Sequence, residues 1–169
     1  MPGGKWEMVD GAIHGTSSKE ESRHGTLLSN AIYDNFTVRS QFRVTSGDSG
    51  FYFRAEPVNG GVSVHGFQAE IDTSAETGGL YETGGRAWVS KPTYGEKENQ
   101  KIYRQGEWNE MTVGAHGTRV VVRVNGRKTA ELMDDKIGRL KGHLGLQLHG
   151  GQDMDVTFKQ VEKLVAAKP

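Results

Sequence analysis

The stretch 66-GFQAEIDTSAETGGLYETGGRAWV-89 is the most informative part of this chain for predicting its fold. It starts with strict alternation, because every second residue from Phe67 to Ile71 is apolar and the residues between them are polar. Such a period of two places one apolar and one polar face on a β-strand. A loop and two further short strands follow, separated by the tight turn Thr83–Gly85. The stretch therefore predicts two or three antiparallel strands whose solvent-exposed face is rich in carboxylate and amide side chains.

Similar alternating runs recur through the rest of the chain, at intervals of about 8–12 residues. Clear examples are Phe36–Val44 and Gly142–His149, and Asn125-Gly126 is a strong signal for a two-residue hairpin turn. Only the segment 134–140 and the C-terminal tail look briefly helical, and the segment 91–104 is expected to be an irregular loop. We therefore predict an all-β sandwich of two antiparallel sheets.

Composition limits the number of domains and the classes of partner. A chain of 169 residues is expected to form a single domain over residues 1–169. Its 21 basic residues balance its 21 acidic ones, so charge gives no argument for binding nucleic acid or an anionic membrane. No apolar run reaches the length of a membrane span, and cysteine is absent, which excludes disulfides and thiolate chemistry. The first eleven residues lack the pattern of a signal peptide.

Three strands are expected to combine their polar faces into one concave patch. These strands are Gly50–Ala55, Gly66–Asp72 and Gly142–His149. Planar polar side chains can hydrogen-bond the hydroxyls of a sugar, aromatic rings can cover its C–H faces, and a carboxylate or imidazole can transfer protons. The residues expected in the patch are Tyr52, Arg54, Gln68, Glu70, Asp72, Gln147 and His149, with Tyr81, Trp88 and Tyr103 as aromatic residues at its rim.

Several candidates have a structural alternative. Glu82 and Arg86 flank a tight turn, so they either belong to the site or form an ion pair across the turn. Glu70 and Asp72 on one face repel each other unless a cation lies nearby, which favours a functional role for this pair. His149 is either a structural donor or a catalytic group. The other histidines have no metal-binding spacing, and the motifs of zinc hydrolases, serine hydrolases and phosphate loops are absent.

Eight segments, in this order, resemble the 3-keto-disaccharide hydrolase family (DUF1080). They are WEMVDGAIHG (6–15), LLSNAIYDNFTVRSQFRV (27–44), SGFYFRAE (49–56), GFQAEID (66–72), GGLYETGGRAWV (78–89), GEWNEMTV (106–113), RVVVRVNGRKTAEL (119–132) and GHLGLQLHGG (142–151). The resemblance implies a concanavalin A-like jelly-roll sandwich. One departure is that family members usually begin with a further strand and a Gly-Trp pair before the position of Trp6. The family also suggests a periplasmic or secreted bacterial protein, with a signal peptide that this sequence lacks.

The resemblance implies chemistry on glycosides that are already oxidised at C3 of the sugar. A ketone at C3 acidifies the C2 proton, so a base can form an enolate, an acid can help the aglycone leave from C1, and water can then add. From strand-face geometry we assign the base to Glu70, with Asp72 as the next candidate. Arg54 and His149 would stabilise the enolate, and Glu82 would be the acid or would orient Arg86. The residues expected to bind the sugar are Tyr52, Gln68, Arg86, Trp88 and Gln147.

Some properties stay open at the level of the sequence. The sequence identifies no definite cofactor, and a divalent cation held by Glu70, Asp72 and His149 is one candidate. The expected partner is an oxidised glycoside, and the oligomeric state is not predicted. A non-catalytic, lectin-like carbohydrate-binding module is the main competing function, and an interaction domain with a polar seam is a weaker one. The enzyme requires Glu70 or Asp72 within about 6 Å of Arg54 and His149 inside one cleft.

Overall fold

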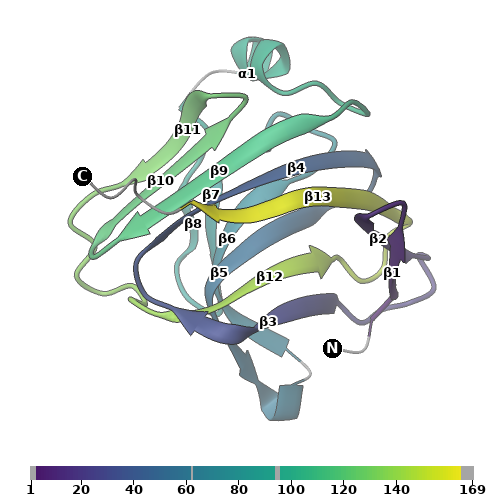
Figure 1. The fold of residues 1–169 in the computed structure, drawn as a ribbon, viewed down its shortest axis with the longest axis horizontal. Coiled ribbons are helices and arrows are strands. Elements are labelled where there is room, and N and C mark those ends of the chain that lie inside the picture. Colours follow the sequence, from purple (N-terminus) through teal and green to yellow (C-terminus); the bar gives the residue numbers. More distant parts are fainter. Residues whose placement is uncertain (1–2, 62, 94–95, 165–169) are drawn as a thin grey trace.

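The computed structural model describes residues 3–61, 63–93 and 96–164, and two antiparallel sheets dominate it (Figure 1). The seven-stranded sheet has the spatial order β1 (Lys5–Val9), β2 (Ala12–Ser17), β13 (Met154–Leu164), β4 (Phe36–Ser46), β9 (Asn109–His116), β10 (Arg119–Val124) and β11 (Arg127–Leu132). The six-stranded sheet has the order β3 (Gly25–Tyr33), β12 (Gly142–Leu148), β5 (Ser49–Val58), β6 (Ser63–Ile71), β7 (Leu80–Thr83) and β8 (Ala87–Ser90). The predicted all-β sandwich is confirmed.

The apolar faces of the two sheets meet in one continuous core. In β4 the alternation is complete, since every second residue from Phe36 to Val44, including Ser40, is buried, while Arg39 and the other residues between them are partly or fully exposed. Figure 1 shows β4, β9 and β13 in front of β5 and β6. Phenylalanine rings from both sheets pack together, and each fully buried ring contributes roughly 1.5–3 kcal/mol. This core fixes which face of each strand is left for function.

The three strands with polar faces lie side by side, with β5 between β12 and β6. Gly50 of β5 is opposite both Gln147 and Glu70, and Tyr52 is opposite Gln68. Because directly opposed residues of antiparallel strands point to the same face, these side chains share the outer surface of the sheet. Segments that are far apart in sequence are thus joined into the single polar surface that was predicted.

Arg54 does not lie on that surface. The pairing of β5 with β6 shifts register between Phe53 and Glu56, and Arg54 has a φ of 48°, which is rare for a residue other than glycine. This bulge turns the side chain away, and it is 2% exposed. Its guanidinium donates hydrogen bonds to three backbone carbonyls, at Asp34 (3.3 Å), Gly117 (2.8 Å) and Arg139 (3.0 Å). The expectation that Arg54 stands beside Tyr52 is therefore wrong.

Three local predictions also fail outside the polar strands. The segment 134–140 forms bends rather than a helix, whereas the expected loop at 91–104 contains helix α1 (Glu96–Ile102). This helix is short and rich in Glu, Lys and Gln, so propensity favours it without any apolar periodicity. Tyr103 is buried and stacks on Phe42 at 6.0 Å instead of lining a rim.

The remaining short element is the 3₁₀-helix η1 (Asn59–Gly61). Among the described residues, no helix is both long and apolar enough to cross a membrane.

The bulge at Arg54 depends on Gly142 in the neighbouring strand. A Cβ atom at Gly142 would lie 2.3 Å from the carbonyl carbon of Arg54 and 2.5 Å from the amide nitrogen of Ala55. Both are backbone atoms, so the bulge would have to move. We expect Gly142→Ala to lower the free energy of unfolding by about 1–3 kcal/mol in a denaturant titration.

The matched control is Gly114→Ala in β9, where the nearest atom to the added methyl group is Thr37 Oγ1 at 3.6 Å. We expect this variant to change the free energy of unfolding by less than about 1 kcal/mol. Equal losses in the two variants would contradict the importance of close packing at the bulge.

Candidate functional site

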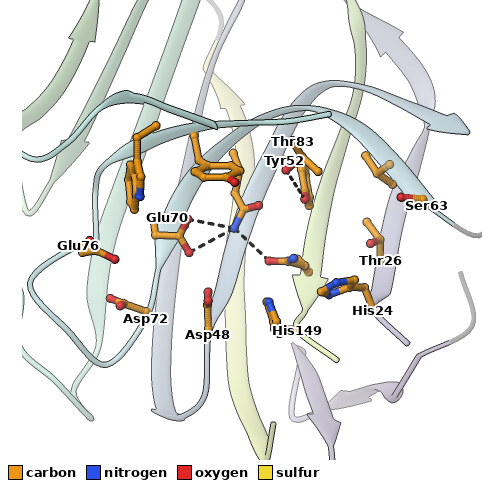
Figure 2. Close-up of a pocket in the computed structure, with 15 residues that line it drawn as sticks. His24, Thr26, Asp48, Tyr52, Ser63, Glu70, Asp72, Glu76, Thr83 and His149 are labelled. Atoms are coloured by element: carbon orange, nitrogen blue, oxygen red, sulfur yellow. Dashed lines mark hydrogen bonds between the residues drawn. The ribbon is translucent and has the colours of Figure 1, made fainter. Parts of the chain in front are cut away.

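A polar cavity of about 420 Å³ opens on the outer face of the six-stranded sheet (Figure 2). This volume is in the range of sites for small molecules. Among the described residues, fifteen line the cavity and none of these is Lys or Arg. They are His24, Thr26, Asp48, Tyr52, Ser63, Val64, Gln68, Glu70, Asp72, Glu76, Tyr81, Thr83, Trp88, Gln147 and His149.

Gln68 is the centre of the hydrogen-bond network on the cavity floor. Its amide nitrogen donates to Gln147 Oε1 at 3.0 Å and to the two carboxyl oxygens of Glu70 at 3.2 and 3.3 Å (Figure 2). Gly50 leaves the space for this amide, since a Cβ there would lie 2.4 Å from Gln68 Nε2. The network connects β12 to β6 across β5, and its three side chains are each at most 7% exposed.

Glu70 is the most strongly perturbed acid of the cavity. Burial is the main cause that raises its pKa to about 10, and a hydrogen bond with Asp48 and the negative charge of Asp48 raise it further. Asp48 Oδ1 is buried, and no N–H group or hydroxyl of the described residues donates a hydrogen bond to it. Two adjacent carboxyl groups cannot both ionise cheaply, so the pair holds one proton. At neutral pH, Glu70 is therefore a buried proton donor.

Asp72 also lines the cavity, but its carboxylate organises the loop that follows β6. The backbone N–H of Ser74 donates to Oδ1 at 3.0 Å and the hydroxyl of Thr77 donates to the same oxygen at 2.9 Å. The hydroxyl of Ser74 donates to Oδ2. Both oxygens of Asp72 therefore accept hydrogen bonds from this loop, and its negative charge helps to raise the pKa of Glu70.

Two histidines occupy the opposite end of the cavity, where Figure 2 shows His24 and His149 close together. Their rings are 4.5 Å apart, centroid to centroid, and almost perpendicular. Both rings contact one residue, because the N–H of Gly150 donates to His24 Nδ1 at 3.1 Å and its carbonyl lies 2.8 Å from His149 Nδ1. Burial and the neighbouring His149 lower the pKa of His24, while Asp48 partly opposes this effect. The cavity thus has an acidic end and an imidazole end.

Aromatic side chains form a wall of the cavity. Tyr52 is buried, its hydroxyl shares a 2.8 Å hydrogen bond with Thr83, and burial raises its pKa to about 12. Tyr81 and Trp88 pack edge to face at 5.5 Å. Lys91 covers one face of the Trp88 ring, with its ammonium 5.0 Å from the ring centroid. Such a wall can pack against the C–H groups of a sugar.

Two sequence candidates, Glu82 and Arg86, lie outside the lining. Glu82 is opposite Phe67, so it points to the core side of the sheet and not to the side of Gln68. It pairs with Arg86, which also makes two parallel 2.9 Å hydrogen bonds to Asp135. The ion-pair alternative therefore describes the contacts of Glu82 and Arg86.

The structure therefore brings most of the candidates together and separates three of them. Those that line the cavity are Tyr52, Gln68, Glu70, Asp72, Trp88, Gln147 and His149, whereas Arg54, Glu82 and Arg86 do not. The clustering expected of an enzyme required Arg54 in the same cleft, and this expectation is not met, although Glu70, Asp72 and His149 line one cavity.

Sequence reasoning missed seven lining residues, three of which stand in turns and loops rather than in strands. Asp48 lies in the turn between β4 and β5, and His24 precedes β3 in a stretch without periodicity. Alternation cannot assign a face to such residues. One signal could have placed Asp48 at the site: it directly precedes β5, and β5 is the neighbour of β6, which carries Glu70. The lining residues that were missed are His24, Thr26, Asp48, Ser63, Val64, Glu76 and Thr83.

The divalent cation stays an untested alternative. Within the described part of the chain, no group of three or more His, Asp or Glu side chains has an arrangement that could hold a metal ion. Glu70, Asp72 and His149 share the cavity but do not form such a group.

Comparisons with known proteins agree with this architecture. Three similar solved structures share the fold at low sequence identity. The carbohydrate-binding module CBM66 from Bacillus subtilis has a TM-score of 0.73 and 17% identity, over 96% of this chain and 92% of that chain. A candidate glycosyl hydrolase from Parabacteroides distasonis has a TM-score of 0.70 and 19% identity, over 94% of this chain and 89% of that chain. A protein of unknown function with a galectin-like fold from Bacillus subtilis has a TM-score of 0.67 and 14% identity, over 94% of this chain and 84% of that chain. Comparison with curated proteins gives no match. The family model described as the 3-keto-alpha-glucoside-1,2-lyase-like domain matches residues 2–162. The chain belongs to this family, as its sequence motifs indicated.

Proposed function

We propose that this protein cleaves the C1–O bond of glycosides that carry a ketone at C3 of the sugar. The observation that carries the proposal is that a buried carboxyl group, Glu70, and a histidine, His149, line one sugar-sized cavity; burial raises the pKa of Glu70 and favours its protonated form. An acid and a base on opposite sides of a substrate are the minimal equipment for elimination. Family membership supports the choice of a 3-keto sugar as the substrate.

The reaction needs one base and one acid. The base removes the proton from C2, and the electron pair of that C–H bond forms an enolate with the C3 carbonyl. The enolate then collapses to a C1=C2 double bond, the C1–O bond breaks, and the acid protonates the departing oxygen. The products are an unsaturated 3-keto sugar and the free alcohol. Addition of water across the double bond would complete a net hydrolysis.

The geometry changes the roles that the sequence suggested. Glu70 carries a proton at neutral pH, so we assign it as the acid that protonates the leaving oxygen rather than as the base. His149 is then the base, because a neutral imidazole keeps one free lone pair. The residues proposed to hold the sugar are Tyr52, Gln68, Gln147 and Trp88.

The proposed reaction is tested by comparing 3-keto-glucosides with their unoxidised parents. We expect release of the aglycone from the oxidised set alone, since only these compounds have an acidic C2 proton. Chromatography of the products measures release, and calorimetry measures binding. Binding of both sets without release would instead favour a carbohydrate-binding module, the function that the similar CBM66 fold makes the main alternative.

Glu70→Gln should separate activity from stability. We expect aglycone release to fall at least about 100-fold, because the amide cannot act as an acid. The glutamine keeps the shape of the protonated acid and can still accept from Gln68 and donate to Asp48. The raised pKa means that Glu70 destabilises the fold progressively as pH rises from about 4.3 toward its folded value. We therefore expect the variant to be more stable than the wild type at pH 8, by about 1 kcal/mol or more.

The matched control is Glu82→Gln, which changes the same residue type on the other face of the sheet. This variant should keep its activity and lose some stability through Arg86. Retained activity in Glu70→Gln together with lost activity in Glu82→Gln would overturn the assignment of the acid.

Asp48→Asn should move the alkaline limb of the pH profile. Removing the negative neighbour lowers the pKa of Glu70, because its charged form is then less disfavoured. The acid should lose its proton at a lower pH, so we expect the fall in kcat at high pH to begin about one unit or more earlier. An unchanged alkaline limb in a folded Asp48→Asn protein would show that the carboxyl pair does not control this step.

A further inference from the structure

The proposed reaction places negative charge on the C3 oxygen, and the residue first assigned to stabilise it lies elsewhere. Arg54 is engaged by three backbone carbonyls and does not line the cavity. We infer that His24 takes this role, as an Nε2–H donor to the C3 oxygen, while His149 Nε2 accepts the C2 proton. The inference rests on the proposed function and adds to it a residue with a defined role.

The Gly150 peptide groups assign opposite tautomers to the two rings. A backbone N–H can only donate, so His24 Nδ1 must be the acceptor and the ring hydrogen of neutral His24 must be on Nε2. A backbone carbonyl can only accept, so His149 Nδ1 must carry the hydrogen and its Nε2 must carry the lone pair. The atom of Gln152 that lies 3.2 Å from His149 Nδ1 is the amide nitrogen Nε2, also a donor, so this tautomer requires the Gln152 amide to be turned over, with its oxygen accepting from Nδ1–H.

The spacing of the two rings matches the two atoms on which they would act. The C2 hydrogen and the C3 oxygen belong to neighbouring carbon atoms, so a base and a donor that contact both must lie close together. Ring centroids 4.5 Å apart allow each Nε2 to come within hydrogen-bond reach, about 2.6–3.2 Å, of its own atom. Both residues line the same cavity and stand together in Figure 2.

The charge state of His24 also suits a hydrogen-bond donor to the C3 oxygen. The titratable neighbours that act on His24 are His149 and Asp48, and burial together with His149 keeps the ring neutral at pH 7. A neutral imidazole can polarise a carbonyl through its N–H. Because His24 is neutral, its neighbour His149 can become protonated during the reaction without a second positive charge 4.5 Å away.

Two substitutions at His24 distinguish a donor to the substrate from a structural residue. The amide nitrogen of glutamine falls near Nε2, so His24→Gln keeps a donor at the proposed position but loses the acceptor for Gly150. The amide oxygen of asparagine falls near Nδ1, so His24→Asn keeps the bond from Gly150 but loses the donor. His24→Phe loses both groups, and His116→Gln on β9, outside the cavity, is the control.

The measurements are kcat and KM for aglycone release from a 3-keto-glucoside, together with exchange of the C2 hydrogen for deuterium from solvent. We expect kcat and exchange to fall about 100- to 1,000-fold in His24→Phe and His24→Asn, with KM changing much less. His24→Gln should recover at least a tenth of the wild-type kcat, and His116→Gln should match the wild type.

Higher activity in His24→Asn than in His24→Gln would overturn the inference, since it would show that His24 only holds Gly150. Full activity in His24→Phe would also overturn it. If the wild type itself releases no aglycone and exchanges no C2 hydrogen, the proposed function fails instead. The two failures are therefore distinguishable.

Discussion

The hydrogen bonds of the buried Gln68 amide connect the fold to its candidate site. The amide joins Gln147 of β12 to Glu70 of β6 over the bare backbone of Gly50. A buried amide or carboxyl that loses its partner costs roughly 1–3 kcal/mol, so the three side chains require each other and require the strands in this order. The same Gln68 hydrogen bonds that connect the strands also hold the Glu70 carboxyl group at the cavity. Here the packing of the sheet and the chemistry of the site share the same atoms.

A second constraint separates the charges of the six-stranded sheet. The bulge at Arg54 sends the cation to the end of the sandwich, and the Glu82–Arg86–Asp135 ion pairs lie on the core side. No Lys or Arg is therefore left among the described residues that line the cavity, while four carboxyl groups are. A nearby cation would pull the pKa of Glu70 down and remove its proton at neutral pH. The bulge thus preserves the acidity on which the proposed mechanism depends.

The sequence could predict the sandwich and most of the cavity floor because alternation assigns faces. Gln68 and Glu70 on β6, Tyr52 on β5 and Gln147 on β12 all lie on the face that their apolar neighbours leave free. Alternation failed at Arg54, where one extra residue in the strand reverses the face, and it left two alternatives for Glu82, which is opposite Phe67. Neither feature is visible without the register of the neighbouring strand.

The residues of the histidine end were beyond sequence reasoning for a different reason. His24 and Asp48 lie outside the strands, and they reach the cavity only because the ends of β3, β5 and β12 come together there. His149 follows β12 immediately, so its region was predicted, but its tautomer depends on the Gly150 carbonyl and on no pattern in the sequence. Loops held by a rigid sheet often carry functional groups, and here they carry the groups with the most specific hydrogen-bond states.

Glu70 is an unfavourable residue for stability at this position, because burial and the neighbouring Asp48 oppose its ionisation. A leucine or glutamine at this position would avoid the burial of an ionisable group next to Asp48, and natural sequences keep such groups where chemistry needs them. Gly50 adds to the argument, since a glycine inside a strand weakens it and here makes room only for the amide beneath the acid. A lectin needs hydroxyl-binding amides and aromatic rings, which this cavity has, but it does not need a carboxyl group kept protonated at neutral pH. That group is the feature that a purely binding role leaves unexplained.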